Sequence, residues 1–314
     1  MVILADLKMT VESESYIDAM HAVLHHKGWI NGSKAMLAGM TSMAFRFTVN
    51  RRLTEEAPTA YNWVAENFLA ADFIGIGSSQ NAGFSFDATL PLYREAAVSQ
   101  IKKTIDNGIG AVIWRNQFVA VAGYDNAEQS LILSNGSDEM EYLPYNSFGN
   151  PISPYWYYQL FENRIELDHM EICKESLMQA VYRWETHNPL LPETEYACGR
   201  EAYAAIASAL QSGDYDHEGW QATLRCYAAS KRDIRDYFSV LETYWPSLRA
   251  ASVQYACVAE AFGEIERLVL NDSLTETIIS ELLQAAQAEE KAIEEIKAFM
   301  RETLDIREGD IALR

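Results

Sequence analysis

Five short apolar segments, each followed by turn residues, fill most of the chain between residues 109 and 161. In order they read "IGAVIWR", "QFVAVAGYD", "QSLILSN", "MEYLPY" and "PYWYYQLF". Consecutive short strands joined by Asn-, Gly- and Asp-containing turns are typical of an antiparallel meander. Three segments before it, at residues 13–27, 58–70 and 92–107, are predicted as helices. Helices followed by an antiparallel sheet predict an α+β domain.

The sequence pattern changes at about residue 165, after which helical periodicity continues to the C-terminus. We find no convincing strand in this second half. Its last helix is predicted to begin with a capping box, with Ser273 at the N-cap and Glu276 three residues later. We therefore predict two domains, an α+β domain at residues 1–165 and an all-α bundle of about five helices at residues 166–314.

The formal net charge of the chain is −20. Such an acidic surface repels phosphate backbones, so we expect no nucleic-acid partner. It would attract cationic small molecules, although we favour the interpretation that the charge only keeps the protein soluble. No apolar run approaches the ~18 residues that a membrane span needs. The N-terminus lacks a basic region and a long apolar region, so we expect no secretory signal, no membrane partner and a cytoplasmic location.

All four cysteines lie in the second half of the chain, and none precedes Cys173. They do not form a C-x-x-C pair, so they do not indicate a zinc site. Because they lie in helical patterns, we expect them to be small core residues.

The densest group of histidines is His21, His25 and His26. His21 and His25 are four residues apart, the spacing that presents two ligands on one helix face, and Asp18 lies three residues before His21. These residues could form a metal site or could be partly exposed polar residues of a helix. We favour the second interpretation, because no H-E-x-x-H motif or distant third ligand is evident. We predict no metal and no cofactor.

Several short motifs occur in a fixed order along the chain. "GMTSMAFRFTVN" resembles a G-L-T-G-H-A-F-R element, "APTAYNW" resembles P-T-A-W-D-W, and "GREAYAAIASALQSG" resembles a G-x-x-A-Y motif. Together with "NGIGAVIWRNQFVAVAGYD" and "EYLPYNSFG", they resemble the butirosin-biosynthesis protein H family. The N-terminal domain of that family is similar to bacteriocin-processing cysteine peptidases. The resemblance implies a papain-like cysteine-peptidase-type domain followed by an all-α helical bundle.

The resemblance also implies a cysteine-dependent transfer of an acyl group from a carrier protein to an amine. This chemistry needs a thiolate at a helix start, a histidine base and an Asp or Asn that orients the base. The family's nucleophile position falls at Ser15, within a residue or two, and its histidine position falls at Gln117. The orienting position falls at Asn135 or Asp138, of which Asn135 suits the role.

These substitutions argue against the family's catalysis. Serine is a weak nucleophile without a nearby base, and glutamine cannot accept a proton at neutral pH. Loss of one triad member typically leaves only ~10³–10⁴-fold rate enhancement over water. Glutamine can still hydrogen-bond a ligand carbonyl. We therefore predict a catalytically degenerate domain that binds a small molecule, or an acyl or peptide group, in the former active-site cleft. Arg46, Met43 and Tyr124 are predicted to contact this ligand.

Other interpretations remain open. The chain could be an active acyltransferase of secondary metabolism that uses Ser15 and an acyl-carrier protein, or a structural homodimer built through the bundle. For Arg46, we favour internal pairing with an acid over a carboxylate ligand. The aromatic residues 155–158 could line an apolar pocket or form an edge strand. Residues 72–79 form a short β-like run that ends in turn residues. Residues 74–83 are Gly-rich but lack a phosphate-loop motif, so we predict a turn there rather than a phosphate site.

Overall fold

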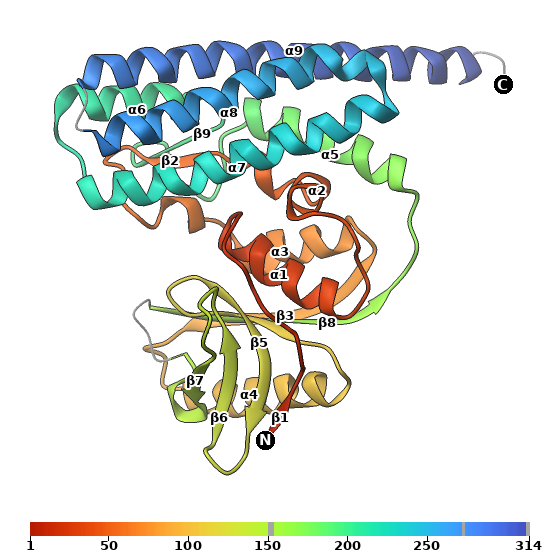
Figure 1. Cartoon of the computed structure of the whole chain (residues 1–314), viewed down its shortest axis with the longest axis vertical. Coiled ribbons are helices and arrows are strands. Elements are labelled where there is room, and N and C mark those ends of the chain that lie inside the picture. Colours follow the sequence, from red (N-terminus) through yellow and green to blue (C-terminus); the bar gives the residue numbers. More distant parts are fainter. Residues whose placement is uncertain (150–153, 272–273, 312–314) are drawn as a thin grey trace. The chain divides into compact units, whose positions relative to one another are not determined.

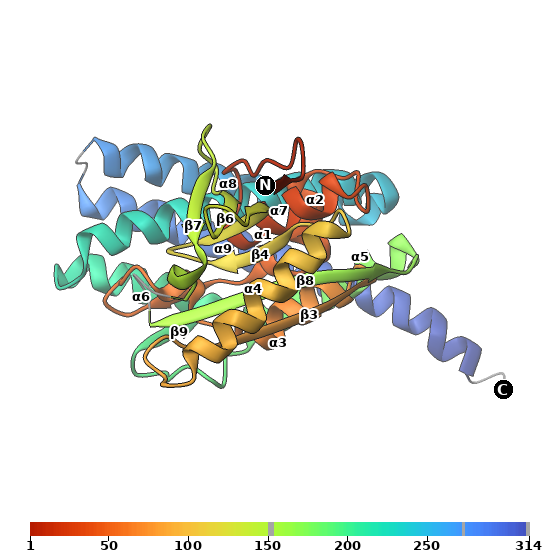
Figure 2. The ribbon, with the colours of Figure 1, turned by 90° about the horizontal axis from the view of Figure 1, so that it is seen from below.

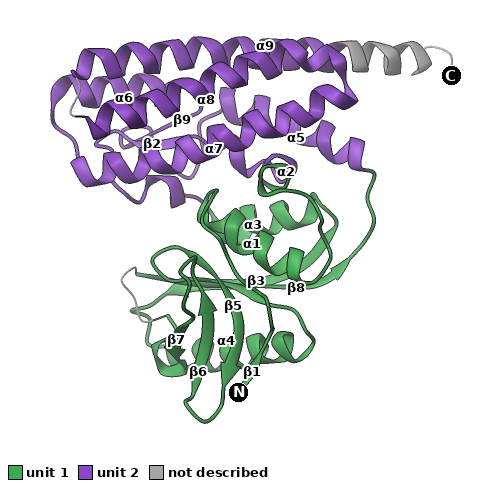
Figure 3. Ribbon diagram, viewed as in Figure 1, with its two compact units in different colours: residues 1–37, 62–168 green, residues 38–61, 169–314 purple. Residues whose placement is uncertain are grey.

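The computed structural model describes residues 1–149, 154–271 and 274–311, with side chains described as far as residue 301. The chain forms two compact units, shown in different colours in Figure 3. Unit 1 comprises Met1–Leu37 and Asn62–Asp168, and unit 2 comprises Ala38–Tyr61 and His169–Arg314. The second part of unit 1 ends at Asp168, close to the residue at which the sequence pattern changes. The predicted first domain included residues 38–61, whereas in the structure these residues group with the C-terminal helices.

Unit 1 is built on a seven-stranded antiparallel sheet in the order β3-β8-β4-β5-β6-β7, with β1 paired to β5 (Figure 1). Its strands are β1 (Val2–Ile3), β3 (Ile76–Phe84), β4 (Ala111–Trp114), β5 (Phe118–Asp125), β6 (Ser130–Ser134), β7 (Glu141–Pro144) and β8 (Tyr155–Arg164). All five predicted meander segments therefore form strands, and the mixture of helix and sheet is that of an α+β protein.

Helices cover both faces of this sheet. They are α1 (Ser15–His26) and α3 (Trp63–Asp72) on one face and α4 (Leu90–Asp106) on the other, whereas the short α2 (Lys34–Met40) follows α1 in the chain. α4 lies along one face, where Ile101 and Ile105 pack in one apolar core with Val119 and Val121 of β5 (Figure 2). Because neighbouring residues of a strand point to opposite faces, Phe118 faces the other side, where its ring meets that of Tyr16 on α1 with centroids 5.4 Å apart. α1 and α3 cover this second face (Figure 1).

Two local predictions for unit 1 are corrected. The helix predicted from residue 58 begins at Trp63, because the Asn62 side chain accepts a hydrogen bond from the Ala65 N–H at 3.1 Å and caps it there. Residues 57–59 form a separate 3₁₀ turn. The predicted turn at residues 74–83 is largely strand β3. It pairs with β8 along its whole length, and this tertiary pairing outweighs the weak strand preference of Gly, Ser and Asn.

Unit 2 is mainly helical. It contains α5 (His169–Glu185), α6 (Arg200–Ser212), α7 (His217–Tyr244), α8 (Arg249–Leu270) and α9 (Thr275–Ile311). Within the described residues, no helix of the chain is both long and apolar enough to cross a membrane. The predicted N-cap Ser273 lies outside the described residues.

The expectation of no strand in the second half is wrong. β9 (Tyr196–Cys198) pairs antiparallel with β2 (Thr48–Asn50), which comes from the segment 38–61. Each strand has only three residues, which is too short to show a periodic pattern. The two strands are also about 150 residues apart in the chain, so the sequence does not indicate that they pair. This pairing is one reason why the segment belongs to unit 2.

Side chains of the same segment also enter the core of unit 2. The ring of Phe47 lies 4.9 Å from that of Tyr203 and 4.7 Å from that of Tyr227. The Tyr227 hydroxyl accepts from the backbone N–H of Thr48 at 2.8 Å and donates to the Thr48 carbonyl. Residues 38–61 therefore complete the core that the C-terminal helices form.

Candidate functional site

Ser15 is the first residue of α1, and its side chain contacts the start of β5. The backbone N–H of Phe118 donates to Ser15 Oγ at 3.3 Å. Gln117 immediately precedes Phe118, in the hairpin between β4 and β5. Ser15 and Gln117 are both half-buried. The structure thus brings the predicted nucleophile position and the predicted histidine position together.

Gln117 also contacts Asn135, the predicted orienting residue. Its Nε2 donates to the backbone carbonyl of Asn135 at 3.1 Å, rather than to the side chain. The Asn135 side chain accepts from the N–H and hydroxyl of Ser137, at 3.1 and 2.8 Å, and donates to Glu141 at 3.2 Å. Glu141 is paired in turn with Arg115 at 3.0 Å. The three predicted positions therefore adjoin, but the Asn135 amide is engaged away from Gln117. The alternative position, Asp138, is exposed.

A buried ion pair fixes the chain that leads to Ser15. The Asp18 carboxylate accepts hydrogen bonds from the backbone N–H groups of Glu12 and Ser13, at 3.2 and 3.1 Å. The Lys34 ammonium lies 2.7 Å from Asp18 Oδ1. Asp18 is fully buried, and burial raises the pKa of its carboxyl although Lys34 and the two N–H groups favour the charged form. These contacts hold the residues before α1 in place.

Sequence reasoning did not find this ion pair. The position of Asp18 could have indicated its role, because an acidic residue in the first turn of a helix can bind free backbone N–H groups. Nothing in the sequence pairs Lys34 with Asp18, because Lys34 comes from the start of a later helix. Its ammonium also donates to the carbonyl and hydroxyl of Thr10, which ties α2 to the N-terminal segment.

The histidines of unit 1 are not placed to act as a base for Ser15. His21 Nε2 lies 3.0 Å from the carbonyl of Gly32, and His26 Nε2 lies 2.8 Å from the carbonyl of Ala5. His25 stacks on His21, with ring centroids 5.3 Å apart. In the part of the chain that the structure describes, no histidine hydrogen-bonds to Ser15.

The same geometry argues against a metal site of Asp18, His21 and His25. The oxygens of Asp18 are occupied by Lys34 and by backbone N–H groups. Among the described residues, no group of three or more His, Cys, Asp or Glu side chains could hold a metal ion. The histidines are therefore best described as polar residues of α1.

Aromatic rings surround Phe118, whose backbone N–H contacts Ser15, on the sheet face that α1 and α3 cover. The ring of Phe118 is 5.0 Å from that of Trp114 and 5.3 Å from that of Trp63. Trp63 also lies 5.6 Å from the ring of Tyr155, which is 46% exposed. These rings provide an apolar surface that is partly open and next to the Ser15 position.

The aromatic run at residues 155–158 is divided between the two faces of the sheet. Tyr157 contacts Phe118 on the α1 face, whereas Trp156 and Tyr158 pack in the core beneath α4. The edge-strand prediction is wrong, because β8 lies between β3 and β4. Alternation along a strand, which sends neighbours to opposite faces, explains why the four rings do not line one pocket.

Tyr124, a predicted ligand contact, does not lie with these residues. It stands at the far end of β5, seven positions from Gln117, which is about 23 Å in an extended strand. Its hydroxyl donates to Asp106 at 2.7 Å, and Lys102 lies 5.0 Å from its ring centroid. Tyr124 therefore belongs to the contact between β5 and α4.

The other two predicted ligand contacts, Met43 and Arg46, belong to unit 2. Met43 is fully buried in a 3₁₀ turn (Met43–Phe45). Arg46 donates to the carbonyl of Pro58 at 2.7 Å, and its guanidinium lies 3.5 Å from the centroid of the Tyr61 ring. Both residues therefore take part in the internal packing of unit 2.

The first residue of the same motif also has a packing role. A Cβ added at Gly39 would lie 2.3 Å from the ring of Tyr237 on α7. Only glycine allows this close approach of backbone and ring. The motif "GMTSMAFRFTVN", from which the family resemblance was partly drawn, thus contains several residues that fit the segment into unit 2.

The chain matches no protein-family model and no curated protein. Its function must be inferred from the side chains and their geometry.

Proposed function

We propose that unit 1 is a papain-like domain whose triad positions are held by Ser15, Gln117 and Asn135. We propose further that it binds a small molecule, or an acyl or peptide group, beside these residues without the family's catalysis. The observation that carries the proposal is the hydrogen bond from the Phe118 N–H to Ser15 Oγ, which joins the helix start to the strand that Gln117 precedes.

Hydrogen-bonding groups at this position suit binding better than catalysis. Ser15 Oγ has no base beside it among the described residues, so it remains a weak nucleophile. Gln117 uses its Nε2 for the Asn135 carbonyl, which leaves Oε1 to accept a hydrogen bond from a ligand N–H. The rings of Trp63 and Tyr155 offer an apolar surface for an acyl or aromatic group nearby.

The proposal is tested by incubating the full chain with acyl-pantetheine thioesters and N-acyl dipeptides. We expect saturable binding, weakened several-fold in Gln117→Ala, and neither product formation nor a covalent adduct by intact-mass spectrometry. Asp138→Ala is the matched control, because this exposed residue lies in the neighbouring turn and should leave binding unchanged. Turnover that Ser15→Ala abolishes would contradict the degenerate assignment.

The second candidate is an acyltransferase that uses Ser15 and accepts its acyl group from a carrier protein. The observation in its favour is the place of Ser15 in the first turn of α1, where the helix dipole stabilises negative charge. The same experiment separates the two functions. An acyl adduct on wild-type protein that is absent from Ser15→Ala would establish the transferase.

A further inference from the structure

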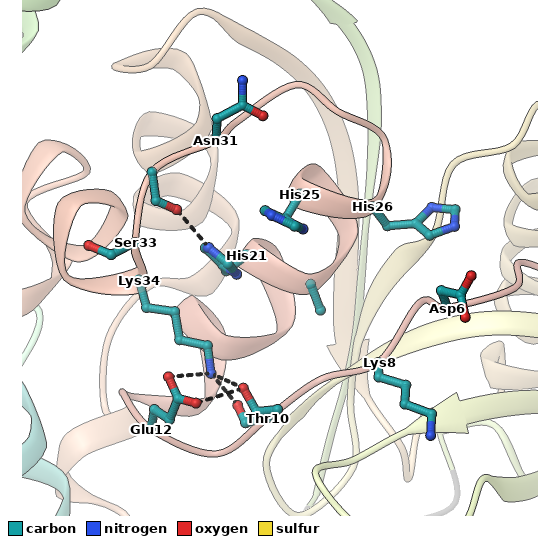
Figure 4. Close-up of a pocket in the computed structure, with 12 residues that line it drawn as sticks. Asp6, Lys8, Thr10, Glu12, His21, His25, His26, Asn31, Ser33 and Lys34 are labelled. Carbon is teal, nitrogen blue, oxygen red and sulfur yellow. Dashed lines mark hydrogen bonds and ion pairs between the residues drawn. The ribbon is translucent and has the colours of Figure 1, made fainter.

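Outside the candidate site, unit 1 has a polar hollow and an open sheet edge. The hollow, of about 430 Å³, lies along α1, and Figure 4 shows the side chains around it. The Lys34 ammonium, on one side of it, lies 2.7 Å from Asp18 and 3.6 Å from Glu12. His21 Nε2 lies 3.0 Å from the carbonyl of Gly32. These groups of the hollow are thus engaged within the chain, whereas the backbone of the sheet edge is open.

The two edges of the sheet are protected differently. The sheet ends in β3 on one side and in β7 on the other. β7 has four residues, carries the charge of Glu141 and ends at Pro144, three features that discourage pairing with another chain. β3 has nine residues, "IGSSQNAGF", with neither a charge nor a proline. Among the described residues β3 pairs only with β8 (Figure 2), so it is a long edge without this protection.

Alternate residues of β3 point their backbone groups away from β8. Just beyond the strand, the N–H of Ser85 donates to the carbonyl of Pro154 at 2.8 Å. Because the residues of an antiparallel pair alternate between bonded and non-bonded positions, this contact fixes which residues of β3 face β8. The N–H of Ala82 agrees with the pattern, since it donates to the Asn81 side chain at 2.9 Å. The residues with outward backbone groups are Ser78, Gln80, Ala82 and Phe84.

Aromatic rings stand at the end of this edge. The ring of Phe84 lies 5.5 Å from that of Tyr155 and stacks on that of Phe86 at 5.1 Å. Phe84 is 45% exposed and Phe86 is 73% exposed. Every second side chain of an added strand would point to the face on which these rings lie. Exposed rings beside unpaired backbone groups therefore provide a surface for the apolar side chains of such a strand.

Negative charge prevails around the edge. Residues 63–89, which include α3 and β3, contain Glu66, Asp72 and Asp87 but no lysine or arginine. The neighbouring β8 adds Glu162 and Arg164, which offset each other. The whole chain has a formal net charge of −20. A strand that carries basic residues is therefore attracted to this edge, and an acidic one is repelled.

We propose that β3 is a docking edge for an extended segment of a partner protein, in which apolar side chains alternate with basic ones. The segment adds a strand beside β3 and bonds to its outward backbone groups, while its apolar side chains pack on Phe84 and Phe86. In strand addition the main chain supplies affinity and alternate side chains supply specificity. The docking edge goes beyond the proposed function, because β5, which Gln117 precedes, is three strands away, or roughly 14 Å.

Fluorescence anisotropy of a labelled peptide tests the docking edge on the full chain. The peptide has the length of β3, and lysine alternates in it with valine and phenylalanine. We expect saturable binding that weakens as salt rises, and several-fold weaker binding when glutamate replaces lysine. A peptide with the same side chains and a fully N-methylated backbone cannot donate to β3, so it should not bind.

Substitutions locate the binding on the chain. Ala82→Pro removes an outward N–H and leaves the bonds to β8 intact, so it should weaken binding several-fold. Phe86→Ser should also weaken it. Tyr142→Ser is the matched control, because Tyr142 is 55% exposed on the opposite edge strand. Gln117→Ala should leave the affinity for this peptide unchanged, so the docking edge and the proposed function can fail separately.

Three results would overturn the proposal. They are the absence of saturable binding, equal affinity for the parent and the N-methylated peptide, and equal affinity for the lysine and the glutamate peptide. Dimerisation of the chain alone that Ala82→Pro abolishes, measured by analytical ultracentrifugation, would also overturn it, because the edge would then belong to a second copy. If Ala82→Pro does not fold, Phe86→Ser and the N-methylated peptide decide.

Discussion

Each unit contains a lysine paired with a carboxylate, both of them buried, but the two pairs have different surroundings. In unit 1, Lys34 and Asp18 lie 2.7 Å apart, next to the hollow along α1. In unit 2, Lys231 on α7 lies 2.7 Å from each oxygen of Glu289 on α9, and its ammonium is 4.5 Å from the centroid of the Phe47 ring. The first pair lies close to solvent, whereas the second is enclosed by aromatic rings.

The polar partners of the two pairs differ as well. Asp18 binds two backbone N–H groups and so fixes a loop, whereas Glu289 binds the hydroxyl of Tyr203 and so joins helices. Burial and the charge of Glu289 hold the pKa of Tyr203 well above its usual range, so the hydroxyl stays protonated and donates. A buried ion pair can thus organise either a local segment or a contact between helices far apart in the chain.

The largest expected effect is that of breaking the enclosed pair. Lys231→Met leaves the Glu289 charge buried without its cation, so we expect the free energy of unfolding to fall by about 3–5 kcal/mol. Urea denaturation followed by circular dichroism measures this. Lys291→Met, at an exposed lysine on the same helix as Glu289, should change stability by no more than about 0.5 kcal/mol. Equal effects of the two substitutions would show that the pair is not enclosed.

A smaller effect is expected for the pair beside the hollow. Lys34→Met should lower the free energy of unfolding by about 2–3 kcal/mol, because water in the hollow can partly replace the ammonium. The exposed Lys8, which lines the same hollow, provides the control substitution Lys8→Met. If Lys34→Met lowers the free energy of unfolding as much as Lys231→Met does, access to solvent does not distinguish the two ion pairs.

The smallest effect is a pH dependence. Burial already raises the pKa of Asp18, and removal of Lys34 should raise it further. The folded Lys34→Met variant then binds a proton at a higher pH than its unfolded chain does, so the variant gains stability relative to wild type as pH falls. The difference in urea midpoint between the two proteins should therefore be smaller at pH 4.5 than at pH 7.5. A constant difference would show that Asp18 does not protonate in this range.

The sequence predicted the elements whose signal is local. The meander of residues 109–161 and the long helices have regular apolar spacing, and the structure contains them. Strand pair β2–β9 and the Lys231–Glu289 contact were not predictable in this way, because they join residues far apart in the chain. Strand β3 was predicted only in part, as a short β-like run in residues 72–79, because its Gly, Ser and Asn residues suit turns, and pairing with β8 continues it to Phe84.

The candidate site was predictable only in part. The structure places Ser15, Gln117 and Asn135 next to one another, at a helix start, a strand start and a strand end. The sequence did not indicate that the Asn135 side chain turns toward Ser137 and Glu141, because short hydrogen bonds within a turn leave no pattern in the sequence. Tyr124 lies at the opposite end of β5 from Gln117, and the length of the strand separates it from the candidate site.

Each unit is built from two separate segments of the chain, and this constrains how genes for such proteins can recombine. Residues 38–61 belong to unit 2 yet are encoded between the two parts of unit 1. A single crossover near residue 168 would leave the C-terminal helices without Phe47, whose ring covers the Lys231 ammonium. Exchange of either unit as an intact module therefore requires three junctions, so the two halves are expected to be inherited together.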